Sequence, residues 1–489
     1  MCIRHLTFVL FSLLIITFSN HSIVYAEETV GHVQFLRGAV SAQNISAGVR
    51  ILSDGSPIFQ GDTITTGKKS FAVLKFIDET KVSIRPDSIF AIDTFSIQEN
   101  NESATMELVR GGMRMVTGFI SKKKTDSFNI NTAVATIGIR GTELDARFCE
   151  TDCLEEADKL PDLAEASYLV VGRVAYVKGE LKVTSGSGGT HLLSKGGPLY
   201  QGDKLITGDD SYAVLAFRDE GRMTLKANTE FHIEKLEFNP DSPDEGSAFF
   251  RLVRGGMRAL TGIIGKGEQE AYQVATPVAT IGIRGTGFDL QCQGKCISGE
   301  TSNLATAKSG LISHLLNTLL PSVMAAIPDD GMFISVWEGE IVVIRSSGEF
   351  ILNQGKAVFI ENEISAPIEL PEIPEFIQQA PEPRPDKVDI DHDALFHSVK
   401  LEGWPPGLYV SVHDGHVRLI QIATGLSIDL GKDEAGYVST VDDTFIRIET
   451  IPGFEDNDPY FRFIKEDSLP LYNLLSEDTL DTGFECVVQ

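Results

Sequence analysis

Four arginines stand beside glycine-rich turns at matching places of a repeated sequence. Arg114 follows a Gly-Gly-Met sequence and Arg140 lies within Thr-Ile-Gly-Ile-Arg-Gly-Thr, and Arg258 and Arg284 repeat them at a spacing of 144 residues. A guanidinium carries a fixed fork of donors, so each arginine could bond several backbone carbonyls of its turn. The alternative is that the arginines face a carboxylate or an anionic glycan of a partner. We favour the structural role and keep all four as candidate partner-binding residues.

Two pairs of cysteines follow the repeated segments. Cys149 and Cys153 come after the first, and Cys292 and Cys296 come after the second. Each pair encloses three residues, and we predict a local disulfide in both pairs. A metal site is the alternative, but zinc takes about four ligands and neither pair has neighbouring His or Cys to complete the set. Cys486 could be a free thiol or an intermolecular link.

The remaining reactive residue types do not form a catalytic or cofactor site. The serines lack a nucleophile elbow, and the histidines do not recur at matching places in the two copies. The alternating carboxylates at residues 389–393 suggest a calcium loop, but Ala394 stands where glycine is needed and Lys400 where glutamate should bind. We therefore predict a non-enzymatic protein with no cofactor and no metal.

The first residues predict export. Arg4 precedes an apolar run over residues 6–18, and Val24-Tyr25-Ala26 offers small residues for a signal peptidase. We expect a signal peptide at residues 1–26 and a periplasmic or secreted protein with no membrane span after cleavage, because the later apolar stretch at 311–327 is interrupted by polar residues and proline. An uncleaved anchor is the alternative. The net charge of −27 argues against nucleic acid as a partner, since phosphate binding needs clustered Lys and Arg.

Short strands joined by polar turns must position these residues. Residues 71–76 and 81–85 are β-branched or aromatic runs around a polar turn, and residues 212–217 and 222–225 repeat the pattern. The early landmarks repeat at a spacing of 141 rather than 144, so three residues are inserted in the second copy, and a loop should hold them.

A shorter repeat occupies the rest of the chain. Residues 331–341 match residues 407–417 at a spacing of 76, and we predict that each is a pair of strands meeting at a Glu-Gly or Asp-Gly turn. An Ile-Pro-x-Phe sequence then closes each unit, at 373–376 and at 451–454. The pattern predicts one recurring β-unit, stacked four times along the chain.

The order of these motifs resembles the FecR domain of bacterial envelope proteins. The resemblance rests on Gly-Asp-x-Ile/Leu, on Leu-Val-Arg-Gly-Gly-Met-Arg and on Thr-Ile-Gly-Ile-Arg-Gly-Thr, and its two copies span about 33–147 and 174–291. It implies an all-β periplasmic domain. In membrane-spanning members it also implies signalling from an outer-membrane transporter to a cytoplasmic sigma factor. This chain has only a short basic region at Arg4 in place of their cytoplasmic segment, so the resemblance implies a protein-binding β-domain here.

Together these observations predict an all-β fold of tandem stacked-strand FecR-type domains, β-solenoid or sandwich-like, with short helical insertions. The predicted parts are a signal peptide at 1–26, a first FecR-like domain at 27–155, a second at 168–296, a helical insertion at 297–330, a closing β-hairpin unit at 331–376, a Pro-rich acidic linker at 377–400 and a C-terminal β-unit at 401–489.

The predicted function is a non-enzymatic module that binds an unidentified envelope protein, as a sensor or signalling subunit. A glycan- or peptidoglycan-binding structural module is the alternative. Sugars stack on aromatic faces, and the chain has only two tryptophans, which favours protein recognition.

Overall fold

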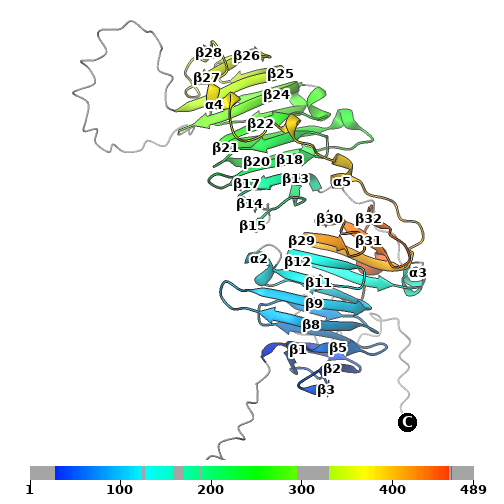
Figure 1. Cartoon of the computed structure of the whole chain (residues 1–489). Helices are drawn as coiled ribbons and strands as arrows, with labels where there is room; N and C mark the ends of the chain where they lie inside the picture. Colours follow the sequence, from blue (N-terminus) through cyan, green and yellow to red (C-terminus); the bar gives the residue numbers. More distant parts are fainter. Residues whose placement is uncertain are drawn as a thin grey trace, which may run out of the picture.

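The computed structural model describes residues 28–123, 127–157, 170–186, 190–267, 269–294, 330–456, 458–461 and 464. These residues form two curled sheets of 16 strands with the same strand order, and the two sheets lie end to end in an elongated stack (Figure 1). The predicted all-β fold of tandem stacked strands is confirmed. The predicted signal peptide at 1–26 and nearly all of the predicted helical insertion at 297–330 lie outside the described residues.

The first sheet takes its strands from both ends of the described chain. They are β1 (Thr29–Arg37), β2 (Val40–Asn44), β3 (Gly48–Ile51), β4 (Pro57–Phe59), β5 (Thr63–Thr66), β6 (Phe71–Phe76), β7 (Lys81–Ile84), β8 (Ile89–Ser96), β9 (Ser103–Arg110), β10 (Gly112–Val116), β11 (Phe128–Asn131), β12 (Ala135–Cys149), β29 (Gly407–Gln421), β30 (Ser427–Leu430), β31 (Ala435–Ser439) and β32 (Phe445–Ile448).

The second sheet is continuous in sequence apart from residues 295–329. Its strands are β13 (Val170–Lys178), β14 (Leu181–Thr184), β15 (Thr190–Leu192), β16 (Pro198–Tyr200), β17 (Lys204–Thr207), β18 (Tyr212–Phe217), β19 (Arg222–Leu225), β20 (Glu230–Glu237), β21 (Ser247–Arg254), β22 (Gly256–Leu260), β23 (Tyr272–Ala275), β24 (Thr280–Gln293), β25 (Gly331–Arg345), β26 (Gly348–Asn353), β27 (Ala357–Ile360) and β28 (Ile368–Leu370).

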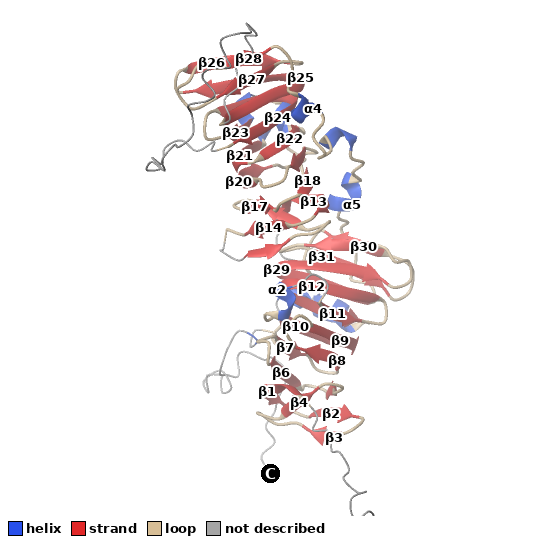
Figure 2. Ribbon diagram, turned by 60° about the vertical axis from the view of Figure 1, so that its left-hand side comes forward, coloured by secondary structure: helices blue, strands red, loops and turns tan. Residues whose placement is uncertain are grey.

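The helices of the described chain are short and lie outside the stacked strands (Figure 2). The α-helices are α2 (Ile120–Lys123), α3 (Asp152–Ala157), α4 (Glu375–Gln378), α5 (His392–Phe396) and α6 (Gly453–Asp456), and the 3-10 turns are η1 (Pro243–Glu245), η2 (Ile264–Lys266), η3 (Gln269–Ala271) and η5 (Pro385–Lys387).

Each sheet folds into two layers that share long bent strands. The beginning of β12 pairs with β11 and its end pairs with β10, so this strand belongs to both layers. The bend falls at Gly141, which has a φ of 60°, a value that glycine adopts without a steric cost. The apolar core lies between the layers, with fully buried side chains such as Phe90, Phe128 and Leu144. The repeated Arg-Gly-Thr motif is therefore the corner of a long strand.

The predicted hairpin tips of the later units are also bends. β25 and β29 run through their Glu-Gly and Asp-Gly sequences without reversing, and Gly339 and Gly415 have φ values of 73° and 84° there. A Cβ on Gly415 would lie 2.1 Å from the carbonyl oxygen of Gly141 on the neighbouring strand. The prediction of a hairpin turn at these glycines is wrong, because a positive φ serves a bulge inside a long strand as well as a tight turn.

The later units each complete one of the two sheets. β25 pairs with β24, whereas β29 pairs with β12 from Ala135 opposite Gln421 to Cys149 opposite Gly407. The second domain is therefore inserted between two parts of the first. The strands between residues 407 and 448, which lie in the predicted C-terminal β-unit, close the first sheet.

Two segments cover the outer faces of the sheets. Residues 374–397, here called the strap, run along the second domain and lie mostly within the predicted Pro-rich linker (Figure 1). The strap is held by hydrogen bonds such as that from Thr224 Oγ1 to the carbonyl of Pro383, at 2.9 Å. Residues 451–456, here called the cap, contain α6 and cover the first domain, where Phe454 is fully buried.

Candidate functional site

Two of the predicted site residues, Arg114 and Arg258, form ion pairs with an aspartate on the next strand. Arg114 lies opposite Asp145, with Nε and Nη2 at 2.5 and 2.6 Å from its carboxylate oxygens. Arg258 lies opposite Asp289, with Nε at 2.9 Å from Oδ1. All four side chains are nearly inaccessible to solvent, so each charge depends on its partner.

The same two arginines hold the segments that cover the sheets. Arg258 donates to the carbonyl of Glu382 at 2.8 Å and also to the carbonyl of Ile377 in α4. Arg114 donates to the carbonyl of Glu455 in α6, at 3.4 Å. Ile377 and Glu455 occupy the same place after the repeated Ile-Pro motif, so the contact is repeated in both domains. This geometry gives Arg114 and Arg258 a structural task, and a role in partner binding stays a prediction for them.

The first domain adds a titratable cluster to this arrangement. His413 Nε2 lies 2.7 Å from the Asp145 carboxylate, and the hydroxyl of Ser411 donates to the buried carboxyl of Glu455. Burial, together with the negative charge of Asp145, raises the pKa of Glu455 to about 8. Burial works against protonation of His413, but the Asp145 carboxylate outweighs it and raises the pKa of the imidazole.

We expect this cluster to make the first domain more stable at pH 5.5 than at pH 8.5. Between the ordinary pKa of 4.5 and about 8, the folded state holds a proton on Glu455 that the unfolded chain has released, so rising pH lowers the free energy of unfolding. The raised pKa of His413 likewise makes the free energy of unfolding fall as the pH rises. The expected difference is on the order of 1–3 kcal/mol in urea unfolding at the two pH values. Glu455→Gln should remove most of it, and an unchanged pH dependence in that variant would contradict the assignment.

The other two predicted arginines lie in different surroundings although they repeat in sequence. Arg140 is 8% exposed and donates to the hydroxyl of Ser194, at the junction between the two domains. Arg284 is exposed at the far end of the second domain. The sequence cannot distinguish them, because the difference comes from what stacks on each sheet.

The domain junction is a buried polar interface. Arg173, fully buried on β13, donates to Glu434 at the start of β31 and to the carbonyl of Gly196 at 3.0 Å. Burial would raise the pKa of Glu434, but the charges of Arg173 and Arg447 hold it below its usual range. The pairing of Arg173 with Glu434 joins residues 261 positions apart, which no local motif could reveal.

Further polar contacts complete the junction. Arg418 Nε lies 3.1 Å from Asp429 Oδ1, and the same guanidinium donates to the carbonyl of Lys195. The backbone N–H of Lys432 donates to the hydroxyl of Tyr200 at 2.6 Å. The turn that follows β15 is thus held against β29 and β30, and the two domains are docked rather than joined by the chain alone.

Cys149 and Cys292 lie at the ends of β12 and β24, and Cys153 lies in α3. Cys149 and Cys153 form a disulfide with Cα atoms 5.5 Å apart, as predicted. Cys292 is also disulfide-bonded, and its predicted partner Cys296 lies outside the described residues, as does Cys486.

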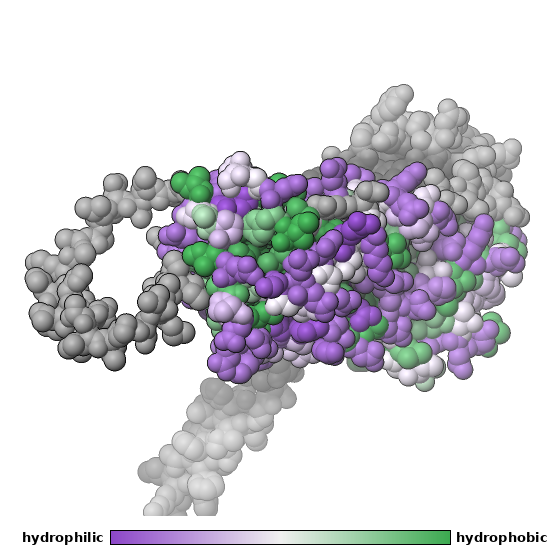
Figure 3. Space-filling model, turned by 90° about the horizontal axis from the view of Figure 1, so that it is seen from above, coloured by the Kyte–Doolittle hydropathy of each residue, from purple (hydrophilic) through white to green (hydrophobic). Residues whose placement is uncertain are grey.

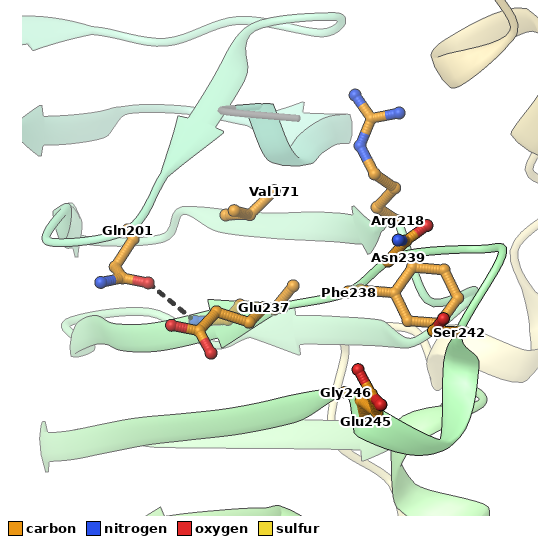
Figure 4. Close-up of a pocket in the computed structure, with 10 residues that line it drawn as sticks. Val171, Gln201, Arg218, Glu237, Phe238, Asn239, Ser242, Glu245 and Gly246 are labelled. Carbon is orange, nitrogen blue, oxygen red and sulfur yellow. Dashed lines mark hydrogen bonds between the residues drawn. The ribbon is translucent and has the colours of Figure 1, made fainter. Parts of the chain in front are cut away.

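A pocket of about 540 Å³ lies on the side of the second domain. The connection from β20 to β21 forms one wall and is three residues longer than the equivalent connection from β8 to β9, so the predicted insertion does lie in a loop. In Figure 4, Gln201 bonds the backbone at Leu236 on one side, while Arg218 and Phe238 lie on the other. Apart from the insertion itself, no motif of the sequence indicates this pocket.

Exposed apolar side chains mark the free end of the first domain. Ile45, Val49 and Ile51 lie on the β2–β3 hairpin, where Val49 and Ile51 are 70% and 80% exposed and Ile45 is fully exposed. β3 pairs with β2 on one side only, so its other edge offers unpaired backbone groups. An apolar hairpin with a free edge is suited to binding another chain. The sequence does not reveal this surface, because its apolar residues alternate as in any half-buried strand.

The described part of the chain lacks the features of a metal site and of a membrane-spanning helix. No group of three or more His, Cys, Asp or Glu side chains is arranged there to hold a metal ion. Within the same ranges, none of the helices has the length and apolar character needed to span a bilayer.

Comparison with known proteins relates the two domains to one family. The family described as FecR protein matches residues 62–155 and 203–303, which are equivalent parts of the two sheets. A comparison with curated proteins gave no match.

Similar solved structures include two of "a putative anti-sigma factor from Parabacteroides distasonis ATCC 8503", at 12% identity and a TM-score of 0.24. The similarity covers 36% of this chain and 62% of that one, so this chain spans less than two thirds of that protein. A structure described as a cell surface anchoring domain is 39% identical over 13% of this chain and 82% of its own, with a TM-score of 0.12. These scores are too low to support an argument from the structures.

Proposed function

We propose that this chain is a non-enzymatic module of the cell envelope that binds a protein partner and acts as a sensor or signalling subunit. The proposal rests on its membership of the FecR protein family through two copies of the domain. The Cys149–Cys153 disulfide supports an oxidising location such as the periplasm or the cell exterior, because cytosolic thiols are kept reduced.

The observation that carries the proposal is the β2–β3 hairpin. Burying a Val or Ile side chain stabilises a complex by roughly 1.5–3 kcal/mol, so three such side chains left in water are a ready source of affinity. The free edge of β3 can accept a strand from a partner, and main-chain hydrogen bonds would then fix the register. The equivalent hairpin of the second domain carries Thr190 in place of Val49 and Leu192, which is 39% exposed, in place of Ile51, so its exposed apolar surface is smaller.

The glycan-binding alternative loses support from the positions of the two tryptophans. The guanidinium of Arg384 in the strap lies 3.8 Å from the ring centroid of Trp337. Trp404 packs edge-on against Phe454 in the cap, with centroids 5.3 Å apart. Both rings therefore have partners within the chain, which leaves less aromatic surface for stacking on a sugar.

We expect a Val49→Thr plus Ile51→Thr variant to lose its envelope partner. Both side chains are exposed, so the substitutions should leave folding intact while removing roughly 10-fold or more in affinity. The measurement is crosslinking and co-purification of the tagged protein from its own envelope fraction. Val441→Thr, which changes an equally exposed valine elsewhere in the first domain, is the matched control. Equal recovery of partners by both variants and the parent would remove the hairpin from the proposal.

A further inference from the structure

We propose that the far end of the second domain binds the free end of the first domain in a second copy of this chain, by repeating the junction that joins the two domains within one copy. Copies would then add head to tail. This inference rests on the turn at residues 53–55, which directly follows the β2–β3 hairpin at the same end of the molecule, and it does not depend on the sensor function.

The internal junction provides the template. It is formed by the last strands of the first sheet, β29 to β32, against β13, β16 and the turn at residues 193–197. In that turn Ser194 receives a hydrogen bond from Arg140, and Gly196 has a φ of 85°. Asp429 of β30 lies directly against Gly196, since a Cβ on this glycine would be 1.8 Å from its carboxylate oxygen.

Both free ends of the molecule have the strand arrangement that this junction uses. The far end consists of β25 to β28, which pair with one another as β29 to β32 do. For example, Ile341 lies opposite Leu352 in the far end, and the equivalent Val417 lies opposite Leu430 at the junction. The free end of the first domain contains β1 and β4, which pair as β13 and β16 do. One copy therefore carries both halves of the interface, one half at each end (Figure 1).

The arginine contact can be repeated between copies. Arg284 stands at the place of Arg140 and is exposed, while Ser53 stands at the place of Ser194 and is exposed as well. Gly55, two residues after Ser53, has a φ of 78° and so gives its turn the same conformation as that of Gly196. Ser53 and Gly55 thus present to solvent the surface that Arg140 recognises inside the molecule.

The centre of the far end is apolar where the internal junction is charged. Ile351 replaces Asp429 and is 58% exposed, Val342 replaces Arg418, and Ile368 on β28 is 51% exposed. Seen from above in Figure 3, this end shows hydrophobic surface between hydrophilic residues. Exposed apolar side chains at the place of an interface are evidence that something covers them.

The contact between copies should be weaker than the internal junction. His32 and Lys356 stand where Arg173 and Glu434 pair, so that buried ion pair is not repeated. Lys356 is occupied by an ion pair with Glu369 at 2.8 Å. The interface is also heterologous, because different surfaces meet, and such contacts add subunits in one direction instead of closing a dimer. We infer reversible, concentration-dependent chains of copies.

The test uses two complementary variants of the full exported chain. The far-end variant is Arg284→Gln with Ile351→Gln, and the free-end variant is Ser53→Arg with Asp54→Arg. All four residues are exposed, and circular dichroism and thermal melting of each variant verify folding before use. Sedimentation velocity over a concentration series then measures association of the parent, of each variant and of their equimolar mixture.

We expect the parent to form species larger than a dimer as its concentration rises, and each variant alone to associate at least 10-fold more weakly. The mixture should form a one-to-one dimer and nothing larger, because only one intact interface remains between the two variants. A parent that stays monomeric, variants that associate like the parent, or a mixture without the dimer would each overturn the proposal. Because association is measured on the purified chain, with no envelope protein present, this test is separate from that of partner binding.

Discussion

Arg258→Ala is expected to lower the free energy of unfolding of the second domain by about 3–5 kcal/mol. The substitution leaves Asp289 buried without its ion pair and removes the donor that bonds the carbonyls of Glu382 and Ile377. Burial raises the pKa of Asp289, and the charge of Arg258 opposes this rise. The variant loses that opposing charge. Urea unfolding followed by intrinsic fluorescence measures the loss, and limited proteolysis should show earlier cleavage in the strap.

Two controls distinguish the buried pair from a surface charge. Arg284→Ala removes an exposed member of the four repeated arginines and should change the free energy of unfolding by less than about 0.5 kcal/mol. Arg258→Ala combined with Asp289→Ala removes both charges and should recover part of the loss, since no unpaired carboxylate remains. An Arg258→Ala protein as stable as the parent would show that the pair does not hold the strap.

Arg173→Ala should have an effect of similar size, about 3–5 kcal/mol, on the docking of the two domains. Arg173 is fully buried and bonds both Glu434 and the carbonyl of Gly196 across the junction. Without it, the buried carboxylate of Glu434 keeps the backbone N–H of Gly431, at 2.7 Å, and the more distant charge of Arg447, at 3.9 Å. We expect calorimetry to show two separate unfolding transitions, because the second domain would no longer stabilise the first.

The matched variant for this prediction is Arg173→Ala with Glu434→Ala, which removes the unpaired carboxylate as well. It should lose less stability than Arg173→Ala alone, and the difference measures the coupling between the two side chains. A single unchanged transition in Arg173→Ala would mean that the apolar surfaces, and not the buried ion pair, hold the domains together.

The features predictable from the sequence were those set by local pattern or by repetition. Alternating apolar residues and repeated glycines identified an all-β tandem fold, and the spacing of Cys149 and Cys153 identified their disulfide. The strands that follow Gly-Asp turns also form as expected, because each is specified by neighbours within a few residues.

The features that could not be predicted depend on contacts between distant parts of the chain. Nothing in the sequence of β29 indicates whether it pairs with β12 or with a strand nearer in the chain, because both choices bury the same apolar face. Arg140 and Arg284 have the same local sequence, yet one is buried by the second domain and the other is exposed. The proline-rich segment carries little apolar periodicity, and its packing as a strap depends on distant side chains such as Arg258 and Thr224, which bind its carbonyls.

The most direct test of the protein-binding proposal is photo-crosslinking in living cells from a probe residue at position 49. A probe at position 190, the equivalent place on the second domain, is the matched control, because both sites lie on the same kind of hairpin edge. The proposal predicts a discrete adduct between this chain and one envelope protein from position 49 and none from position 190. No adduct from position 49, or the same adducts from both positions, would contradict it.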